Sequence, residues 1–147
     1  MRIFLDTNVL ASAAATRGLC ADVLREVLAC HELLISRQVL SELHRVLKSK
    51  FGEPPELIGD FLWLLQQDTL QVDPVVLPQV ELRDQDDLGI LGAAVQGEAE
   101  VLVTADKELL ALGRVESLAI LSPRQFWERL KTEHRQQSRG RKRRRSR

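Results

Sequence analysis

Carboxylate side chains follow two short apolar segments of this sequence, each near the point where the segment ends. Asp6 comes directly after residues 3–5, and Asp106 comes shortly after residues 101–103. Short apolar runs that end in polar residues are typical of strands buried on both faces of a parallel sheet. Ligands of such sheets collect at the carboxyl ends of the strands. The sequence therefore predicts that Asp6 and Asp106 meet at one edge of a sheet.

Two further acids lie on predicted helices. Asp87 is in the first turn of a helix expected over residues 84–97 and shares the face that packs on the sheet. Glu42 borders the apolar stripe of a helix expected over residues 37–50. Each acid alone also has a structural explanation, as a turn residue, a helix cap or a half-exposed helix residue.

A cluster of four carboxylates at one sheet edge would repel itself and would need a cation. The three histidines of the chain have no spacing that suggests a metal site. Oxygen ligands without His or Cys indicate Mg²⁺ or Mn²⁺.

Five apolar segments alternate with helical patterns along the chain. Strands are expected at residues 3–5, 33–35, 70–73, 101–103 and 118–121. Helices are expected at residues 20–30, 37–50, 54–65, 84–97 and 107–112 and from residue 122 onward. Parallel neighbours need crossover connections, and helices supply them. The pattern predicts an α/β fold: a single three-layer domain with a mainly parallel, five-stranded sheet flanked by helices.

The composition is that of a folded domain in water, with 44% hydrophobic and 29% charged residues. No apolar stretch approaches the roughly 20 residues of a membrane helix. Polar residues 6–8 interrupt the first apolar run too early for a signal peptide. We therefore expect a cytoplasmic protein without a membrane partner.

The net charge of zero conceals a division of the chain. Residues 135–147 hold eight Lys or Arg and no acid, whereas residues 1–134 hold the remaining 13 basic residues and all 21 acidic ones. The basic segment has no apolar periodicity. We predict a folded domain over residues 1–132 and a basic, disordered tail over residues 133–147.

Four stretches of the chain resemble the PIN domain family of metal-dependent ribonucleases. They are Ile-Phe-Leu-Asp-Thr-Asn at the start, Ile-Ser-Arg-Gln-Val-Leu-Ser-Glu-Leu around Glu42, Asp-Gln-Asp-Asp with the helix after it, and Val-Leu-Val-Thr-Ala-Asp-Lys-Glu-Leu-Leu around Asp106. Their order and separations are similar to the family's pattern over about residues 1–130. The bacterial branch of toxins from toxin–antitoxin pairs is the most similar. Ala105 and Gln85 depart from the residues usual in the family, but neither departure removes a ligand.

The resemblance implies a Mg²⁺- or Mn²⁺-dependent endoribonuclease that hydrolyses phosphodiester bonds of single-stranded or structured RNA. The family's acidic quartet carries over to Asp6, Glu42, Asp87 and Asp106, of which Asp6, Asp87 and Asp106 are expected to hold metal. Supporting polar groups carry over to Asn8, Asp84 and Thr104. The resemblance also implies a small antitoxin protein as a partner and leaves a homodimer open.

Affinity for RNA must come from basic residues, because an acidic pocket repels phosphates. The candidates near the site are Arg17, Arg37 and Lys107. The tail offers Arg141, Lys142 and Arg143 for a contact that does not depend on RNA sequence. The alternative is that the tail is a solubilising run without a contact.

Other classes of protein fit less well. Phosphatases whose Asp nucleophile follows a strand need a second Asp two residues later, where this chain has Asn8. A phospho-receiver domain needs paired acids before its phosphorylated Asp, and they are absent from the sequence. The remaining alternative is a non-catalytic PIN-like module that binds RNA or protein, and the retention of all four acids argues against it.

Overall fold

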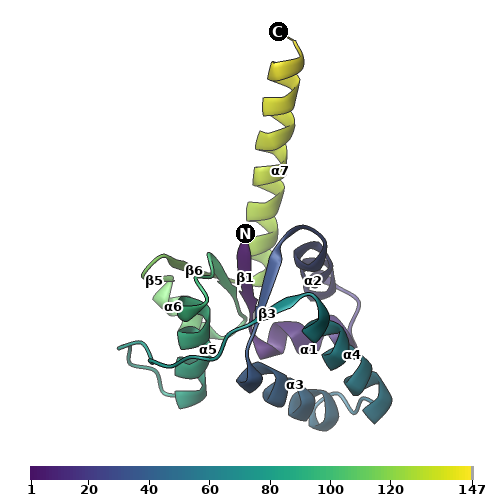
Figure 1. Cartoon of the computed structure of the whole chain (residues 1–147), viewed down its shortest axis with the longest axis vertical. Helices are drawn as coiled ribbons and strands as arrows, with labels where there is room; N and C mark the ends of the chain where they lie inside the picture. The colour runs from purple at the N-terminus through teal and green to yellow at the C-terminus, as the bar shows by residue number, and fades with distance from the viewer. Residues whose placement is uncertain (147) are drawn as a thin grey trace.

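The computed structural model describes residues 1–146 and contains a central sheet flanked by helices (Figure 1). The strands are β1 (Arg2–Leu5), β2 (Glu32–Ile35), β3 (Thr69–Gln71), β4 (Val101–Val103), β5 (Arg114–Val115) and β6 (Leu118–Leu121). Their order in the sheet is β3-β2-β1-β4-β6-β5, and every pair is parallel except β5 with β6. The predicted three-layer α/β fold with a mainly parallel sheet is confirmed.

The predicted number of strands was wrong, because the sheet has six strands and not five. The additional strand, β5, has only two residues, one of them charged, so it shows neither alternation nor an apolar run. It pairs antiparallel with β6 across a tight turn in which Glu116 has a positive φ of 52°. Strands of this length leave no recognisable pattern in a sequence.

The first strand lies at the centre of the sheet and is fully buried over its apolar residues. Phe4 pairs with Leu34 of β2 on one side and with Leu102 of β4 on the other. Leu5 and Val103 are partners in the same register, so β1 and β4 end side by side. This register brings the residues after each strand together.

Seven helices in residues 1–146 cover the sheet. They are α1 (Thr7–Ala15), α2 (Leu19–Cys30), α3 (Arg37–Ser49), α4 (Pro55–Gln67), α5 (Gln85–Gln96), α6 (Lys107–Leu112) and α7 (Pro123–Arg145). The predicted stripe of α3 is real, since Val39, Leu43 and Leu47 are buried, and Ser36 caps the helix by accepting from the Val39 N–H. None of the helices in this part of the chain is long and apolar enough to cross a membrane.

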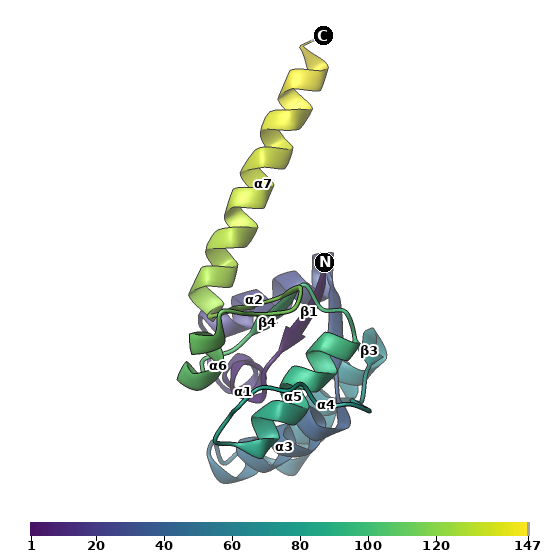
Figure 2. The same ribbon diagram turned by 90° about the vertical axis from the view of Figure 1, so that its left-hand side faces the viewer.

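The last helix, α7, differs from the expectation of a disordered tail, because it continues to Arg145. Its first half packs on the body through buried Phe126 and Leu130, and its second half projects from the body (Figures 1 and 2). Lys and Arg have good helix propensity, and cations in a last turn interact favourably with the helix dipole. These local effects favour the helix, whereas Gly140 and the repulsion between cations one turn apart oppose it. The domain boundary at residue 132 stays a prediction.

Candidate active site

The Thr104 hydroxyl connects the residues that follow β1 and β4. Thr104 donates from Oγ1 to Asp6 Oδ2 at 2.7 Å and accepts at 3.0 Å from the backbone N–H of Asp106. Thr104 is fully buried and Asp6 nearly so. The hydroxyl therefore fixes the Asp6 carboxylate relative to the segment that carries Asp106.

Asp6 and Asp106 are also helix caps, so the structural explanation and the site explanation hold together. Asp6 Oδ1 accepts from the Thr7 N–H at 2.7 Å at the start of α1. Asp106 Oδ1 accepts from the N–H groups of Glu108 and Leu109 at the start of α6. A carboxylate at a helix N-terminus is held in place and stabilised by the helix dipole.

Glu42 faces the start of α1 from α3. Thr7 donates from Oγ1 to Glu42 Oε2 at 2.7 Å, and Gln38 donates from Nε2 to Glu42 Oε1 at 2.9 Å. Both carboxylate oxygens therefore have a fixed partner. Thr7 thus links Asp6, which accepts from its N–H, with Glu42, which accepts from its hydroxyl.

A contact between α3 and α5 holds the Glu42 side of the site. The Gln38 amide donates to the backbone carbonyl of Asp86 at 2.7 Å as well as to Glu42. A Cβ at Gly89 would overlap with Gln38 Oε1, so the absence of a side chain at Gly89 makes room for this amide. Sequence reasoning missed both residues, although Gln38 lies one helical turn before Glu42 and Gly89 lies two residues after Asp87.

The two buried carboxylates, Asp6 and Asp87, both have raised pKa values. Burial raises the pKa of Asp6, which the hydrogen bonds from Thr104 and Thr7 counteract and the negative charges of Glu42 and Asp106 reinforce. Burial and the charges of Asp106, Asp84, Asp6 and Glu108 raise the pKa of Asp87 to about 7. Asp6, Glu42, Asp87 and Asp106 thus form one electrostatic unit, which we call the carboxylate cluster.

The supporting residues that the sequence predicts fall into different places. Thr104 joins the cluster directly, as described. Asp84 caps α5 by accepting from the Asp86 N–H at 2.9 Å and acts on Asp87 through its charge. Asn8 is exposed on the first turn of α1, and the preceding residue, Thr7, makes the contacts to the acids.

The basic residues predicted to contact RNA do not all lie near the cluster. Arg37 and Lys107 begin the helices that follow β2 and β4, so they lie at the carboxyl edge of the sheet and are exposed. Arg37 donates its N–H to Asp73, whose carboxylate is also 3.5 Å from the guanidinium. Arg17 lies in the turn between α1 and α2. The tail residues Arg141, Lys142 and Arg143 lie on the projecting part of α7.

The donor atoms of the cluster suit a hard divalent cation, since they are carboxylate oxygens whose mutual repulsion a cation would relieve. In residues 1–146, however, no three Asp, Glu, His or Cys side chains enclose a position for a metal ion. Hydrogen bonds to protein donors occupy Asp6 and Glu42 on both oxygens. The residues therefore fit a cation in chemistry, and the side chains would have to draw together to hold it.

A mainly parallel sheet with a buried acid after β1 and a half-buried acid after the adjacent β4 defines an α/β domain whose carboxyl edge is an acidic site. A family model described as the PIN domain matches residues 2–108, which include the whole carboxylate cluster. The chain belongs to the PIN domain family. A comparison with curated protein sequences finds no significant match.

Solved structures support the fold. VapBC2 from Rickettsia felis, bound to a DNA fragment from its promoter, is 21% identical and matches 82% of this chain and 97% of that one, with a TM-score of 0.58. VapBC-1 from nontypeable Haemophilus influenzae is 22% identical over 84% and 98% of the two chains, also at 0.58. VapC20 from Mycobacterium tuberculosis, a toxin that cleaves the sarcin-ricin loop, is 16% identical over 78% and 97%, at 0.56. At these identities the likeness establishes a shared fold.

Proposed function

We propose that this protein is a divalent-metal-dependent ribonuclease that hydrolyses phosphodiester bonds of single-stranded or structured RNA. The observation that carries the proposal is the carboxylate cluster of a PIN domain, in which Thr7 and Thr104 connect the segments that carry Asp6, Glu42 and Asp106, and Asp87 is coupled to Asp6 and Asp106 by charge. A structural role alone does not require two buried acids, Asp6 and Asp87, whose pKa values are raised, because such an arrangement costs stability. Strongly shifted pKa values of this kind, with their cost in stability, are common at active sites.

The residues of the cluster would divide the work. Asp6, Asp87 and Asp106 would hold Mg²⁺ or Mn²⁺, and Glu42 would act through water or on a second ion. The bound cation would supply Lewis-acid stabilisation of charge on the phosphate. Asp6 and Asp106 keep their positions through the caps of α1 and α6, and Glu42 keeps its position through Thr7 and Gln38. Exposed Arg37 and Lys107 at the same edge would contact RNA phosphates.

Incubation of the purified protein with a mixture of RNAs tests the proposal. We expect cleavage with Mn²⁺ or Mg²⁺ and none with excess chelator. RNA that is bound but left intact under every metal condition would contradict the nuclease proposal and would favour the non-catalytic binding module.

We further propose that the protein is the cytoplasmic toxin of a toxin–antitoxin pair. The fold is shared with toxin–antitoxin structures, and Leu57, Trp63 and Leu64 of α4 are exposed apolar side chains that a protein partner could cover. Co-purification with the product of a small upstream gene that has a DNA-binding pattern would support this role. A neighbourhood without such a gene would count against it.

Glu42→Gln should lower the rate of cleavage about tenfold, a smaller loss than removal of a direct ligand causes. The variant keeps an oxygen that can accept from Thr7, but the charge is lost and one amide N–H₂ would face the Gln38 donor. Cleavage rates over a range of Mg²⁺ concentrations measure the effect. Rates equal to the wild type at every concentration would show that Glu42 is only a half-exposed helix residue.

Gly89→Ala should lower cleavage several-fold and leave stability within about 1 kcal/mol of the wild type. The new methyl group displaces the Gln38 amide from Glu42 and from the Asp86 carbonyl. Alanine gains about 1 kcal/mol in helix propensity, which offsets hydrogen bonds worth about 1 kcal/mol each. Cleavage rates and urea unfolding would be measured together.

Gly59→Ala on α4 is the matched control, because nothing lies within 4 Å of a Cβ at that position. It should gain stability without any change in cleavage. Equal activity of the Gly89→Ala variant and this control would show that the Gln38 contact does not serve the site.

A further inference from the structure

The distal half of α7, residues 135–145, is the most strongly charged surface of the protein. It holds seven Lys or Arg and no acid, and it contains no apolar side chain. The segment lies outside the residues that match the PIN domain. Its composition therefore needs an explanation of its own.

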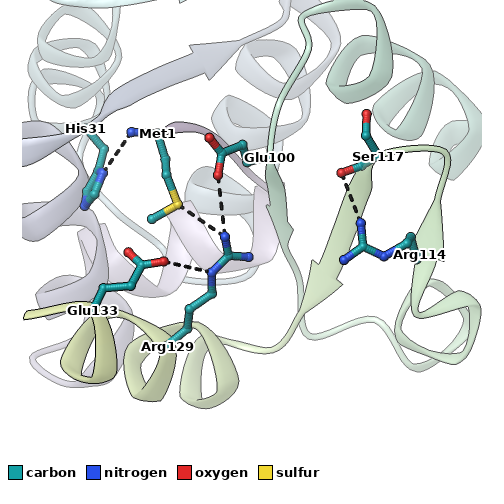
Figure 3. Close-up of polar contacts among 7 residues, drawn as sticks. All are labelled: Met1, His31, Glu100, Arg114, Ser117, Arg129 and Glu133. Carbon is teal, nitrogen blue, oxygen red and sulfur yellow. Dashed lines mark hydrogen bonds and ion pairs between the residues drawn. The ribbon is translucent and has the colours of Figure 1, made fainter. Parts of the chain in front are cut away.

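The course of α7 places this segment beyond the edge of the sheet that lies opposite the carboxylate cluster. Arg129 contacts Glu100 at 3.5 Å, just before β4, and the sulfur of Met1 at 3.6 Å, just before β1 (Figure 3). Five residues later, His134 contacts Glu26 of α2 at 3.1 Å. Asp6 and Asp106 follow the other ends of the same two strands. The helix has thus reached the amino edge by residue 129 and then continues away from the body (Figure 2).

The separation can be expressed in nucleotides. Strands of about four residues span roughly 13 Å, and the sixteen helical residues that follow Arg129, up to Arg145, add about 24 Å. The tip of α7 is therefore about 37 Å from the cluster along this direction. With about 3.4 Å per nucleotide in a stacked strand, roughly eleven nucleotides are needed to reach from one to the other.

The distribution of charge on the segment favours a polyanion over a protein as its partner. Residues 141–145 are five consecutive cations, and successive helical residues are about 100° apart, so positive charge surrounds the helix. A protein interface has an apolar core on one face, which this segment cannot provide. Phosphate contacts need charge only.

We propose that residues 135–145 form an arm that binds the phosphate backbone of a long RNA while another part of the same strand lies at the carboxylate cluster. The proposal rests on the proposed ribonuclease function and adds a substrate class, RNA longer than about eleven nucleotides. The acidic body repels RNA, and the arm raises the local concentration of the strand without contacting the scissile bond.

The test compares the full chain with a variant in which Arg141, Lys142 and Arg143 are replaced by Gln, a residue of similar helix propensity. The control replaces Arg141 and Arg143 by Lys, which keeps the charge. Binding of a 30-nucleotide poly(U) is measured in chelator, so that no cleavage occurs. We expect the Gln variant to bind at least tenfold more weakly, with a log–log salt slope reduced by about 2, at about 0.7 per lost contact. The Lys control should bind as the wild type does.

Cleavage kinetics with Mn²⁺ then test the reach of the arm. The Gln variant should raise KM for the 30-nucleotide RNA without a change in kcat, and a five-nucleotide RNA should be cleaved equally by all three proteins. Unchanged affinity and salt slope would overturn the proposal, as would an equal effect on the short RNA. Tighter binding to a DNA duplex than to poly(U) would also overturn it, because the arm would then serve another nucleic acid.

Two outcomes separate this proposal from the proposed function. If the Gln variant loses affinity but no protein cleaves RNA, the ribonuclease proposal fails and the arm remains an RNA-binding element. If cleavage is strong but the Gln variant behaves as the wild type, the arm fails alone. Sedimentation of the wild type and of the Gln variant tests a different partner. A wild-type dimer that dissociates in the Gln variant would show that the arm binds the acidic body of a second copy and not RNA.

Discussion

Asp6→Asn should reduce RNA cleavage at least about a hundredfold while the protein stays folded. Even outer-shell partners of a metal ligand cost 10- to 100-fold when they are removed, and Asp6 is predicted to be a direct ligand. The fold should persist because Asn can still accept from the Thr7 N–H, and the Thr104 hydroxyl has two lone pairs with which to accept from the new amide. Cleavage at saturating Mn²⁺ and far-UV circular dichroism measure the two expectations.

Asp60→Asn is the control for this variant, since Asp60 is an exposed carboxylate on α4. It should cleave at the wild-type rate. Near-wild-type cleavage by Asp6→Asn would remove the basis of the metal-nuclease proposal, and an unfolded variant would be replaced by Asp106→Asn for the same measurement.

Asp87→Asn should stabilise the metal-free protein at neutral and alkaline pH. The pKa of Asp87 is raised from 3.8 to about 7 in the folded state, so the folded protein holds a proton that the unfolded chain releases. The contribution of Asp87 to wild-type stability should therefore fall as pH rises from about 4 to about 7 and level off above that. Three pKa units correspond to up to about 4 kcal/mol at 1.36 kcal/mol per unit. Because Asn does not titrate, the variant does not lose this stability as pH rises.

Urea unfolding in chelator between pH 4.5 and 8 would measure this difference. The two proteins should be close in stability at the acid end and should diverge as the pH increases. Added Mn²⁺ should raise the stability of the wild type more than that of the variant, because a ligand that binds only the folded state stabilises it. Parallel curves over the whole pH range would show that Asp87 is not under electrostatic strain.

The sequence predicted the parts of the site that depend on a single element. Asp6 and Asp106 could be placed because unambiguous apolar runs precede them, and Glu42 could be placed because α3 has a clear stripe. The contact of Gln38 with Asp86 across Gly89 depends on how α3 and α5 approach each other, and no local pattern encodes that. Gln38 and Gly89 belong to the candidate site because of how α3 and α5 pack together, and their residue types do not indicate it.

Prediction of the fold from the sequence was also limited, at the elements that leave little pattern in the sequence. β5 is too short for a periodicity, and α1 forms from a small-residue stretch rich in alanine. The tail was predicted to be disordered because it has nothing to bury. Helix propensity does not depend on burial. The Arg, Lys and Gln residues of α7 after residue 134 are good helix formers.

The central position of β1 has a consequence for biosynthesis. Its neighbour β4 follows 98 residues later, since Ile3 pairs with Val101. At 5 to 20 residues per second, β1 waits roughly 5 to 20 s on the ribosome before that partner exists. Asp6 and Asp106 cannot meet earlier, so an unfinished chain carries no assembled site. A nuclease of the proposed kind would be inert towards the messenger RNA and the ribosome until the segment that carries Asp106 has left the ribosome.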